Sequence, residues 1–347
     1  MSPEIALWLA QDAVTNGAIY ALLALALIVV YTVTRVILVP QGEFVSYAAM
    51  SLATLQAGKV PGTVYLLLLG GAAVVVLDAW ALIRRKAFRA LTTSLCWNVL
   101  LPLLVAAAAW GAAARPDDVL PQVGVTLTIV TLMGPILYRL AFQPLANASI
   151  LVLLIIAVAV HYLMTGLGLF FFGGEGLRST ILPGLQFQVG SLIITAQSAA
   201  VVVTAVILSI VLAVLFGRTV RGKALRATAI NRIGARLVGI SAEFSGRLSF
   251  ALAALIGAVS GILVSPITTI YYDTGFLISL KGFVGAIIGG MTSYPLAVIG
   301  SLLVGFLESF SSFWASAFKE SIVFTLIIPV LLWRSLATRR IEEEEEP

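Results

Sequence analysis

Long apolar runs recur along the whole chain, and no other feature of the sequence restricts its fold as strongly. Each run holds roughly 18–20 residues, which is enough for a helix to cross the hydrocarbon core of a bilayer. Charged residues make up only 11% of the chain, whereas about a quarter of the residues in a soluble domain are charged. The short alternating segments of a β-barrel do not occur. The sequence therefore predicts an all-α polytopic integral membrane protein.

About ten or eleven transmembrane helices are expected from these runs. Hydropathy places them near residues 17–35, 41–58, 63–83, 91–113, 119–140, 149–172, 191–217, 248–268, 276–292, 295–313 and 320–334. The segment 276–292 is the weakest crossing, because glycines recur through it. It is expected to be either a full span or a broken, re-entrant helix. Residues 173–190 are rich in glycine and predict an irregular outer loop.

The positive charges predict which side of the membrane each end of the chain occupies. If the N-terminus lies outside, only Lys59, Arg115, Arg178 and Lys319 lie on the outer side, and Lys281 falls within a span. All the others of the 21 Lys and Arg residues then lie on the cytoplasmic side. Because cytoplasmic loops carry an excess of Lys and Arg, we expect an outer N-terminus and a cytoplasmic C-terminus.

The side chains that most enzyme chemistry requires are missing from the sequence. The chain has one histidine, His161, and one cysteine, Cys96, and both lie in apolar runs. Neither a His/Cys metal cluster nor a Cys/His nucleophile is therefore expected, and Cys96 is interpreted as a small core residue. The phosphate-binding pattern GxxxxGK[ST] is also absent. We expect no cofactor, no enzyme activity and no nucleic-acid partner, since the positive charges lie at helix ends rather than on one soluble face.

Ionisable residues at membrane depth are candidates for a functional site. A charge at the centre of a membrane helix costs about 2.5–3.5 kcal/mol, so such residues usually face protein or water. Glu43 and Lys281 are interpreted either as lining a pore or gate, or as a buried structural pair or snorkelling side chains. Glu308 lies nearer the outer end among serines and is the third candidate for a transport pathway. Asp78 lies close to Arg84, which favours a local interfacial role.

One long basic segment, residues 218–247, lies outside the predicted spans. It carries Lys and Arg throughout and one acidic residue, Glu243. Apolar residues recur in it at helical spacing and predict a stripe along one face of a helix: Ile230, Ile233, Leu237 and Ile240. Gly239 can end this helix and Ser241 can cap the next one, so we expect short helices with a break. Binding to anionic lipid explains the charge, whereas docking of a partner protein would also explain the stripe.

The stretch GRTVRGKALRATAINRIGARLVGIS, residues 217–241, resembles the coupling loop of bacterial branched-chain amino acid ABC permeases of the LivH type. Three further stretches agree: GAIYALLALALIVVYTV with QGEF, AFQPLANASILVL, and GFLISLKGFVGAIIGGMTSYPLAVIGSLLVGFLES. The resemblance implies an ABC importer permease fold in the bacterial inner membrane, with residues 1–334 forming one permease domain. Residues 77–118 are not part of the usual pattern and are interpreted as an inserted helix pair. Residues 335–347 are interpreted as an acidic cytoplasmic tail.

The same resemblance implies partners and site residues. The chain would be one of two related permease subunits, working with two cytoplasmic ATPase subunits, a periplasmic solute-binding protein and membrane lipid. The residues implied for coupling to the ATPases are Arg226, Ala227, Thr228, Ala229, Asn231, Arg232, Ala235, Arg236, Leu237 and Gly239. The solute would be a branched-chain or related hydrophobic amino acid, or a solute of the urea and short-amide class.

The chain departs from the family pattern at several positions. Ile230 and Asn231 stand where an acidic or amide pair is usual. Leu38 replaces an asparagine, and Leu296 replaces a glycine. A charge-based contact with the ATPase at Ile230 and a polar pore contact at Leu38 are therefore not expected.

Two other functions stay open from the residues. The first is a secondary transporter driven by an ion gradient, with Glu43 or Glu308 as the group that binds the proton or sodium ion. The second is a membrane scaffold without transport activity. Transport by this chain without ATPases would favour the secondary transporter. Substrate uptake that is unchanged by substitutions in the basic segment would favour the scaffold.

Overall fold

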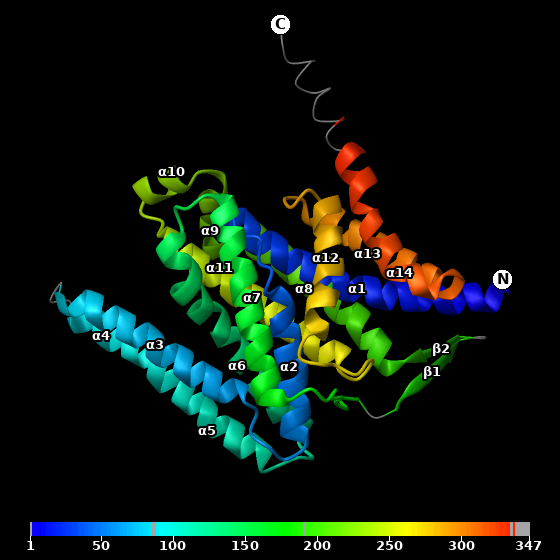
Figure 1. Cartoon of the computed structure of the whole chain (residues 1–347), viewed down its shortest axis with the longest axis horizontal. Helices are drawn as coiled ribbons and strands as arrows, with labels where there is room; N and C mark the ends of the chain where they lie inside the picture. The colour runs from blue at the N-terminus through cyan, green and yellow to red at the C-terminus, as the bar shows by residue number, and fades with distance from the viewer. Residues whose placement is uncertain (1, 85–87, 183, 190–191, 334–335, 337–347) are drawn as a thin grey trace, which may run out of the picture. The chain divides into compact units, whose positions relative to one another are not determined.

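The structure of the chain is a computed structural model, and it describes residues 2–84, 88–182, 184–189, 192–333 and 336. These residues are mainly helical, and the helices follow the order of the apolar runs (Figure 1). Among them, eight helices are long and apolar enough to cross a membrane: Pro3–Thr34, Thr92–Ala113, Val119–Leu145, Ile150–Phe172, Ala196–Arg218, Ala242–Val264, Tyr294–Trp314 and Ser316–Trp333. The remaining expected spans are represented by shorter apolar helices, Thr63–Ala79 and Thr274–Ile288, and by the helix Gln41–Gln56.

The N-terminal half of the chain is helical up to the outer loop. Its elements are α1 (Pro3–Thr34), α2 (Gln41–Gln56), α3 (Thr63–Arg84), α4 (Phe88–Leu95), the π-helical turn η1 (Cys96–Leu100), α5 (Leu101–Ala113), α6 (Val119–Leu137), the π-helical turn η2 (Tyr138–Phe142), the 3₁₀ turn η3 (Gln143–Leu145) and α7 (Ile150–Phe172). The C-terminal half holds β1 (Gln186–Val189), β2 (Leu192–Thr195), α8 (Ala196–Arg218), α9 (Val220–Ile230), α10 (Arg232–Leu237), α11 (Ala242–Val264), α12 (Thr274–Ile288), α13 (Tyr294–Trp314), the 3₁₀ turn η4 (Ser316–Phe318) and α14 (Lys319–Thr325).

Three expectations about the elements are corrected. Helix α1 begins at Pro3, well before the expected start at 17, because a helix can continue through polar residues that interrupt the apolar run. Residues 173–190 do not form a wholly irregular loop: β1 pairs with β2 as an antiparallel hairpin, with Gln186 opposite Thr195. Helix α12 is continuous but only 15 residues long, which corresponds to about 22 Å and is shorter than a bilayer core of about 30 Å. The tail at 337–347 lies outside the described residues.

The chain divides into two compact units. The first unit comprises residues 1–28, 184–210 and 278–347, and the second comprises 29–183 and 211–277. Helices α1, α8 and α12 contribute residues to both.

The second unit is built on α11, which packs against α2 and α6. Small residues allow these helices to approach closely. A Cβ atom on Gly261 of α11 would meet the backbone of Val45 in α2, and one on Gly134 of α6 would meet the backbone of Phe250 in α11. Gly42 and Gly275 approach each other in the same way, backbone against backbone. The core of this unit therefore depends on glycine at the helix crossings.

Helices α3, α4 and α5 form a hairpin that packs on α6 in the second unit. Its core contains Val64, Leu67, Val105, Ala106, Ala109 and Ile129. Asp78 on α3 accepts a hydrogen bond from Ser94 Oγ at 2.6 Å and pairs with Arg139 of η2 at 2.5 Å. Asp78 thus joins the hairpin to the end of α6, and its partner comes from a distant helix. Cys96 is exposed rather than a core residue, and no residue of η1 is buried.

The first unit has a smaller core between α1, α12 and α13. Ala24, Ile28, Ala286 and Ala297 are buried together. Small residues again set the distance between helices, since a Cβ atom on Gly285 would meet Ser301 of α13. This packing places the ionisable residues of α12 and α13 next to α1.

Candidate functional site

Glu43 lies in the first turn of α2, and its side chain is almost fully buried in the second unit. Its Oε1 atom lies 2.5 Å from Nδ1 of His161 on α7 and 3.4 Å from the hydroxyl of Thr165, one helical turn further along α7. The Oε2 atom is buried without a hydrogen-bond partner among the described residues. A buried carboxylate oxygen that lacks a donor is costly. We call Glu43 and His161 the Glu43 pair.

The surroundings of the Glu43 pair are closely packed. The His161 ring stacks on Phe276 of α12, with ring centroids 4.3 Å apart. Ser46, one turn after Glu43, accepts a hydrogen bond from the backbone N–H of Gly275 at 2.8 Å. The Tyr47 hydroxyl donates to the carbonyl of Met164 at 2.6 Å. Contacts from α2, α7 and the start of α12 therefore fix the position of the pair.

Lys281 on α12 lies at the centre of a second group of ionisable residues, in the first unit. Its ammonium contacts Glu308 Oε1 on α13 at 2.5 Å and Glu320 Oε1 on α14 at 3.1 Å. The other oxygen of Glu308 accepts a short hydrogen bond from the Tyr20 hydroxyl of α1. We call these four residues the Lys281 cluster. Lys281 and Glu308 form the buried pair that was one of the two interpretations of Lys281 from sequence.

The basic segment consists of two short helices, as expected. Thr219 caps α9 by accepting from the N–H of Gly222 at 3.0 Å, and Asn231 caps α10 by accepting from the N–H of Gly234 at 2.8 Å. Gly239 follows α10 with a φ of +84°, a left-handed conformation that favours glycine and ends the helix. Ser241 then caps α11 through the N–H of Phe244. The break at Asn231 and the predicted cap at Ser241 follow from local hydrogen bonds of short polar side chains.

An apolar ridge lies on the outside of this segment. It consists of Ile230, Ile233, Leu237 and Val238, whose exposed fractions are 80%, 74%, 83% and 76%. The predicted stripe along a single helix is only partly present: Ile233 and Leu237 lie on α10, whereas Ile230 ends α9 and Ile240 lies after α10 and is half-buried. Large apolar side chains with this exposure in one patch indicate a surface that binds another protein or a membrane.

The residues implied for coupling occupy different environments. Exposed positions are Arg226, Asn231, Arg236, Leu237 and Gly239. Half-buried positions are Ala227, Ala229 and Arg232, whereas Thr228 and Ala235 are buried. The exposed members can contact a partner directly, while the buried ones hold α9 and α10 against the rest of the unit.

Hydrogen bonds connect the basic segment to the helices beneath it. The Thr228 hydroxyl lies 3.1 Å from the hydroxyl of Ser245 on α11. The Arg232 guanidinium donates to the carbonyl of Ala146, just after η3, at 2.7 Å. On α11 the Ala253 carbonyl in turn accepts from Gln41 at the start of α2, at 3.0 Å. One unit therefore contains a continuous series of contacts from the apolar ridge through α11 to the helix that carries Glu43.

Sequence reasoning missed His161, Tyr20 and Glu320 as partners of the candidate residues. His161 offered one signal, since it is the only histidine of the chain and lies in an apolar run. Tyr20 and Glu320 offered none, because each is ordinary in its local context. In the part of the chain that the structure describes, no three His, Cys, Asp or Glu side chains converge to hold a metal ion.

Comparisons with known proteins show the family to which the chain belongs. The family model for the branched-chain amino acid transport system permease component matches residues 9–332. The high-affinity branched-chain amino acid transport system permease protein LivH of Escherichia coli K12 is 31% identical over 217 residues, which cover 59% of this chain and 69% of LivH. The corresponding permease protein BraD of Pseudomonas aeruginosa is 27% identical over 231 residues, covering 65% and 75%. No solved structure matches the chain. The chain therefore belongs to the family of branched-chain amino acid transport system permease components, and it is an all-α, multi-pass protein of the bacterial inner membrane.

Proposed function

We propose that this chain is a permease subunit of an ATP-driven importer for branched-chain or related hydrophobic amino acids. A solute of the urea and short-amide class is the other substrate class that the family resemblance implies. The observation that carries the proposal is the apolar ridge on α9 and α10, a surface outside the spans that is exposed, capped at both helices and anchored to α11. The N-terminus lies outside and the C-terminus in the cytoplasm, which puts the ridge on the side where ATP is available.

The ridge binds the ATPase subunits, and its movement is transmitted within the second unit. ATP binding and hydrolysis on those subunits displace α9 and α10. Thr228 and Ser245 carry the displacement to α11, and the close glycine crossings carry it to α2 and Glu43. Rigid helices that meet at small residues can transmit such shifts, because packed helices slide past one another rather than deform. Of the three pathway candidates, Glu43, Lys281 and Glu308, we propose Glu43 as the pathway residue, because its Oε2 atom is buried without a described partner, whereas Lys281 and Glu308 bond to each other.

The assembly contains a second, related permease subunit, two ATPase subunits and a periplasmic solute-binding protein. Substrate selection rests mainly with the binding protein. Helices α13 and α14 and the inserted residues 77–118 face lipid or the second permease subunit. Residues 77–118 are an accessory helix pair on the permease domain rather than part of the transport pathway.

The proposal is tested at the ridge. Leu237→Asp places a charge at a position that is 83% exposed, so the fold is retained while the apolar contact is lost. We expect the variant to lose the ATPase subunits in a pull-down and to lose substrate uptake in proteoliposomes of the complete assembly. Val220→Asp is the matched control, since Val220 lies on α9, is 84% exposed and is not in the ridge; it keeps both properties.

Two results would contradict the proposal. If Leu237→Asp retains the ATPases and normal uptake, the ridge is not the coupling surface. If the chain alone drives uptake without ATPases, an ion gradient is the energy source and Glu43 or Glu308 becomes the ion-binding group. Labelling of Arg236→Cys by an impermeant maleimide in inside-out vesicles only, in a Cys96→Ser background, is the result expected for a cytoplasmic ridge.

A further inference from the structure

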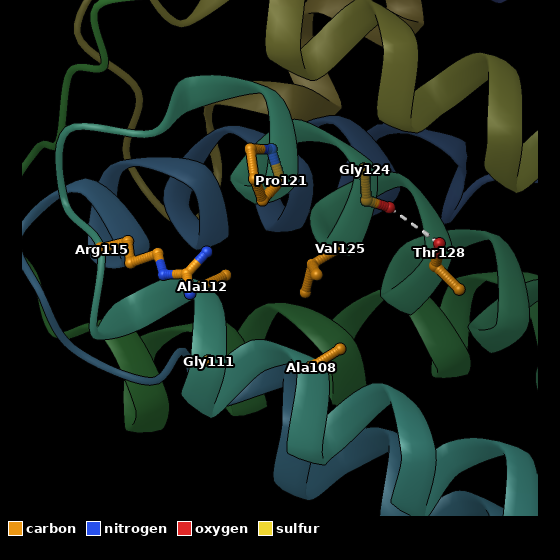
Figure 2. Close-up of a pocket in the computed structure, with 8 residues that line it drawn as sticks. All are labelled: Ala108, Gly111, Ala112, Arg115, Pro121, Gly124, Val125 and Thr128. Atoms are coloured by element: carbon orange, nitrogen blue, oxygen red, sulfur yellow. Dashed lines mark hydrogen bonds between the residues drawn. The ribbon is translucent and has the colours of Figure 1, made fainter.

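A groove lies between α5 and α6, in the part of the chain that the proposed transport mechanism does not use. Its volume is about 590 Å³, and its wall consists of Ala108, Gly111, Ala112, Gly124, Val125 and Thr128 together with Arg115 and Pro121 (Figure 2). The lining is therefore made of small or apolar residues over most of its length. Thr128 adds little polarity, because its hydroxyl donates to the carbonyl of Gly124 at 2.7 Å.

The two glycines of the groove face open space. A Cβ atom on Gly111 or Gly124 would meet no atom within 4 Å. This distinguishes them from Gly134 on the same helix, where a Cβ atom would meet the backbone of α11. Helix packing inside the chain thus does not explain Gly111 and Gly124, which leave room for a molecule from outside.

One end of the groove is charged. Figure 2 shows the Arg115 side chain extending toward Ala112 at this end. Among the described residues, no side chain forms an ion pair with its guanidinium. Asp117 and Asp118 follow two and three residues later, and both are exposed. A free cation and two carboxylates therefore lie within one short turn beside an apolar groove.

The turn that carries these charges is held in place. Gln122 on α6 is fully buried, and its amide donates to the carbonyls of Arg115 at 2.9 Å and Pro116 at 3.0 Å. The N–H of Asp118 also bonds to the carbonyl of Arg115. The backbone of the charged turn is thus held in place by the protein itself, which lowers the entropic cost of binding.

We propose that this groove binds a zwitterionic aminophospholipid of the phosphatidylethanolamine class. The phosphate binds Arg115, since the planar guanidinium matches two phosphate oxygens. The ammonium lies by Asp117 and Asp118, which favour a cation and disfavour a headgroup with net negative charge. One acyl chain follows the groove along the small residues and buries apolar surface on both sides.

Charge complementarity decides between this lipid and the other occupants of a membrane groove. An anionic lipid would satisfy Arg115 but would place its net charge beside two carboxylates. A transmembrane helix of the second permease subunit would fill the apolar part but leave the charged end without a partner. The mixed charge of the turn matches a headgroup that carries one phosphate and one ammonium.

Native mass spectrometry of the full-length chain, purified with its partners, tests the proposal. After removal of bulk lipid, phosphatidylethanolamine, phosphatidylglycerol and phosphatidylcholine with identical acyl chains are added separately. We expect preferential retention of phosphatidylethanolamine. Arg115→Ala lowers its occupancy about fivefold, the effect of one cation against a lipid headgroup. Gly124→Leu, where an added Cβ atom would meet no protein atom within 4 Å, fills the groove and reduces retention to background.

Matched control variants test whether the loss of lipid is specific to substitutions in the groove. Lys59→Ala removes another exposed cation outside the groove, and Gly166→Leu adds a side chain at an α7 glycine that also faces open space; both retain the lipid. The double change Asp117→Asn and Asp118→Asn shifts the preference toward phosphatidylglycerol.

Three outcomes overturn the proposal. The first is equal lipid retention by Gly124→Leu and by the unmodified chain. The second is equal retention of the three headgroup classes. The third is efficient crosslinking of Gly124→Cys to the second permease subunit in the native membrane, which would show that a protein helix occupies the groove.

Discussion

The Glu43 pair and the Lys281 cluster both contain buried ionisable residues, but the oxygens of their carboxylates are bonded to different degrees. In the Lys281 cluster both oxygens of Glu308 are bonded, one to Lys281 and one to Tyr20. In the Glu43 pair one carboxylate oxygen contacts His161, and the other has no partner among the described residues. A buried carboxylate with an unsatisfied oxygen still requires a donor. A buried charge by itself therefore does not identify a transport site in a membrane protein. A buried carboxylate oxygen that lacks a hydrogen-bond donor is the more informative observation.

The partners of the two carboxylates differ as well. Lysine has three hydrogen-bond donors, so Lys281 can hold Glu308 and Glu320 together. Histidine can change its charge near neutral pH, and His161 is held by one nitrogen and by stacking on Phe276. The Lys281 cluster is therefore suited to a fixed link between helices, and the Glu43 pair to a group that exchanges partners during transport.

The largest effect is expected for Lys281→Ala. This change leaves two carboxylates without their cation, and breaking a buried ion pair costs about 3–5 kcal/mol. The free energy of unfolding, measured by denaturant titration in detergent, should fall by that amount. The double variant Lys281→Met with Glu308→Leu should recover most of the loss, because an apolar pair can replace a buried ion pair. A double variant as unstable as the single one would show that the Lys281 cluster is not a structural link.

A smaller effect on stability, with a larger effect on transport, is expected for Glu43→Gln. The amide keeps the shape of the side chain but removes the charge, so stability should fall by about 1–3 kcal/mol. Uptake by the complete assembly should fall at least about tenfold, corresponding to 1.4 kcal/mol in a barrier.

Asp78→Asn is the control for this experiment, since Asp78 is also a buried carboxylate but pairs with Arg139 in the hairpin. It should lose stability without a specific loss of uptake. Normal uptake by Glu43→Gln, at equal amounts of folded protein, would show that Glu43 is not a pathway residue. The Glu43 pair would then be a structural link, like the Lys281 cluster.

The smallest effect is expected for Thr165→Val. The Thr165 hydroxyl is 3.4 Å from Glu43 Oε1 and also donates to the backbone carbonyl of His161 at 2.9 Å. The long contact contributes little, so stability should change by about 0.5 kcal/mol or less. Tyr20→Phe, which removes the hydrogen bond to Glu308, should cost more, about 1.5–3 kcal/mol. Equal losses in the two variants would mean that Thr165 holds Glu43 as firmly as Tyr20 holds Glu308.

The basic segment shows how far local sequence information extends. The two short helices, the glycine that ends α10 and the serine that caps α11 were predictable, because each depends on residues three or four positions apart. Ile240 was predicted to continue the stripe, but α10 ends at Leu237, so Ile240 lies after the helix and is half-buried. The start of α1 at Pro3 was missed for a related reason: hydropathy marks the apolar part of a helix and not the whole helix.

The sequence by itself determined that this chain lies in a membrane, where most of its helices run, and which basic segment lies outside the apolar runs. These properties follow from hydropathy, charge and capping, all of which act over short stretches of chain. Only the tertiary structure decided which buried charges meet. Glu43 and His161 are 118 residues apart, and Tyr20 and Glu308 are 288 apart. Such pairs are selected by the packing of distant helices, because an ionisable group in a bilayer must find its partner in another helix when its own offers none.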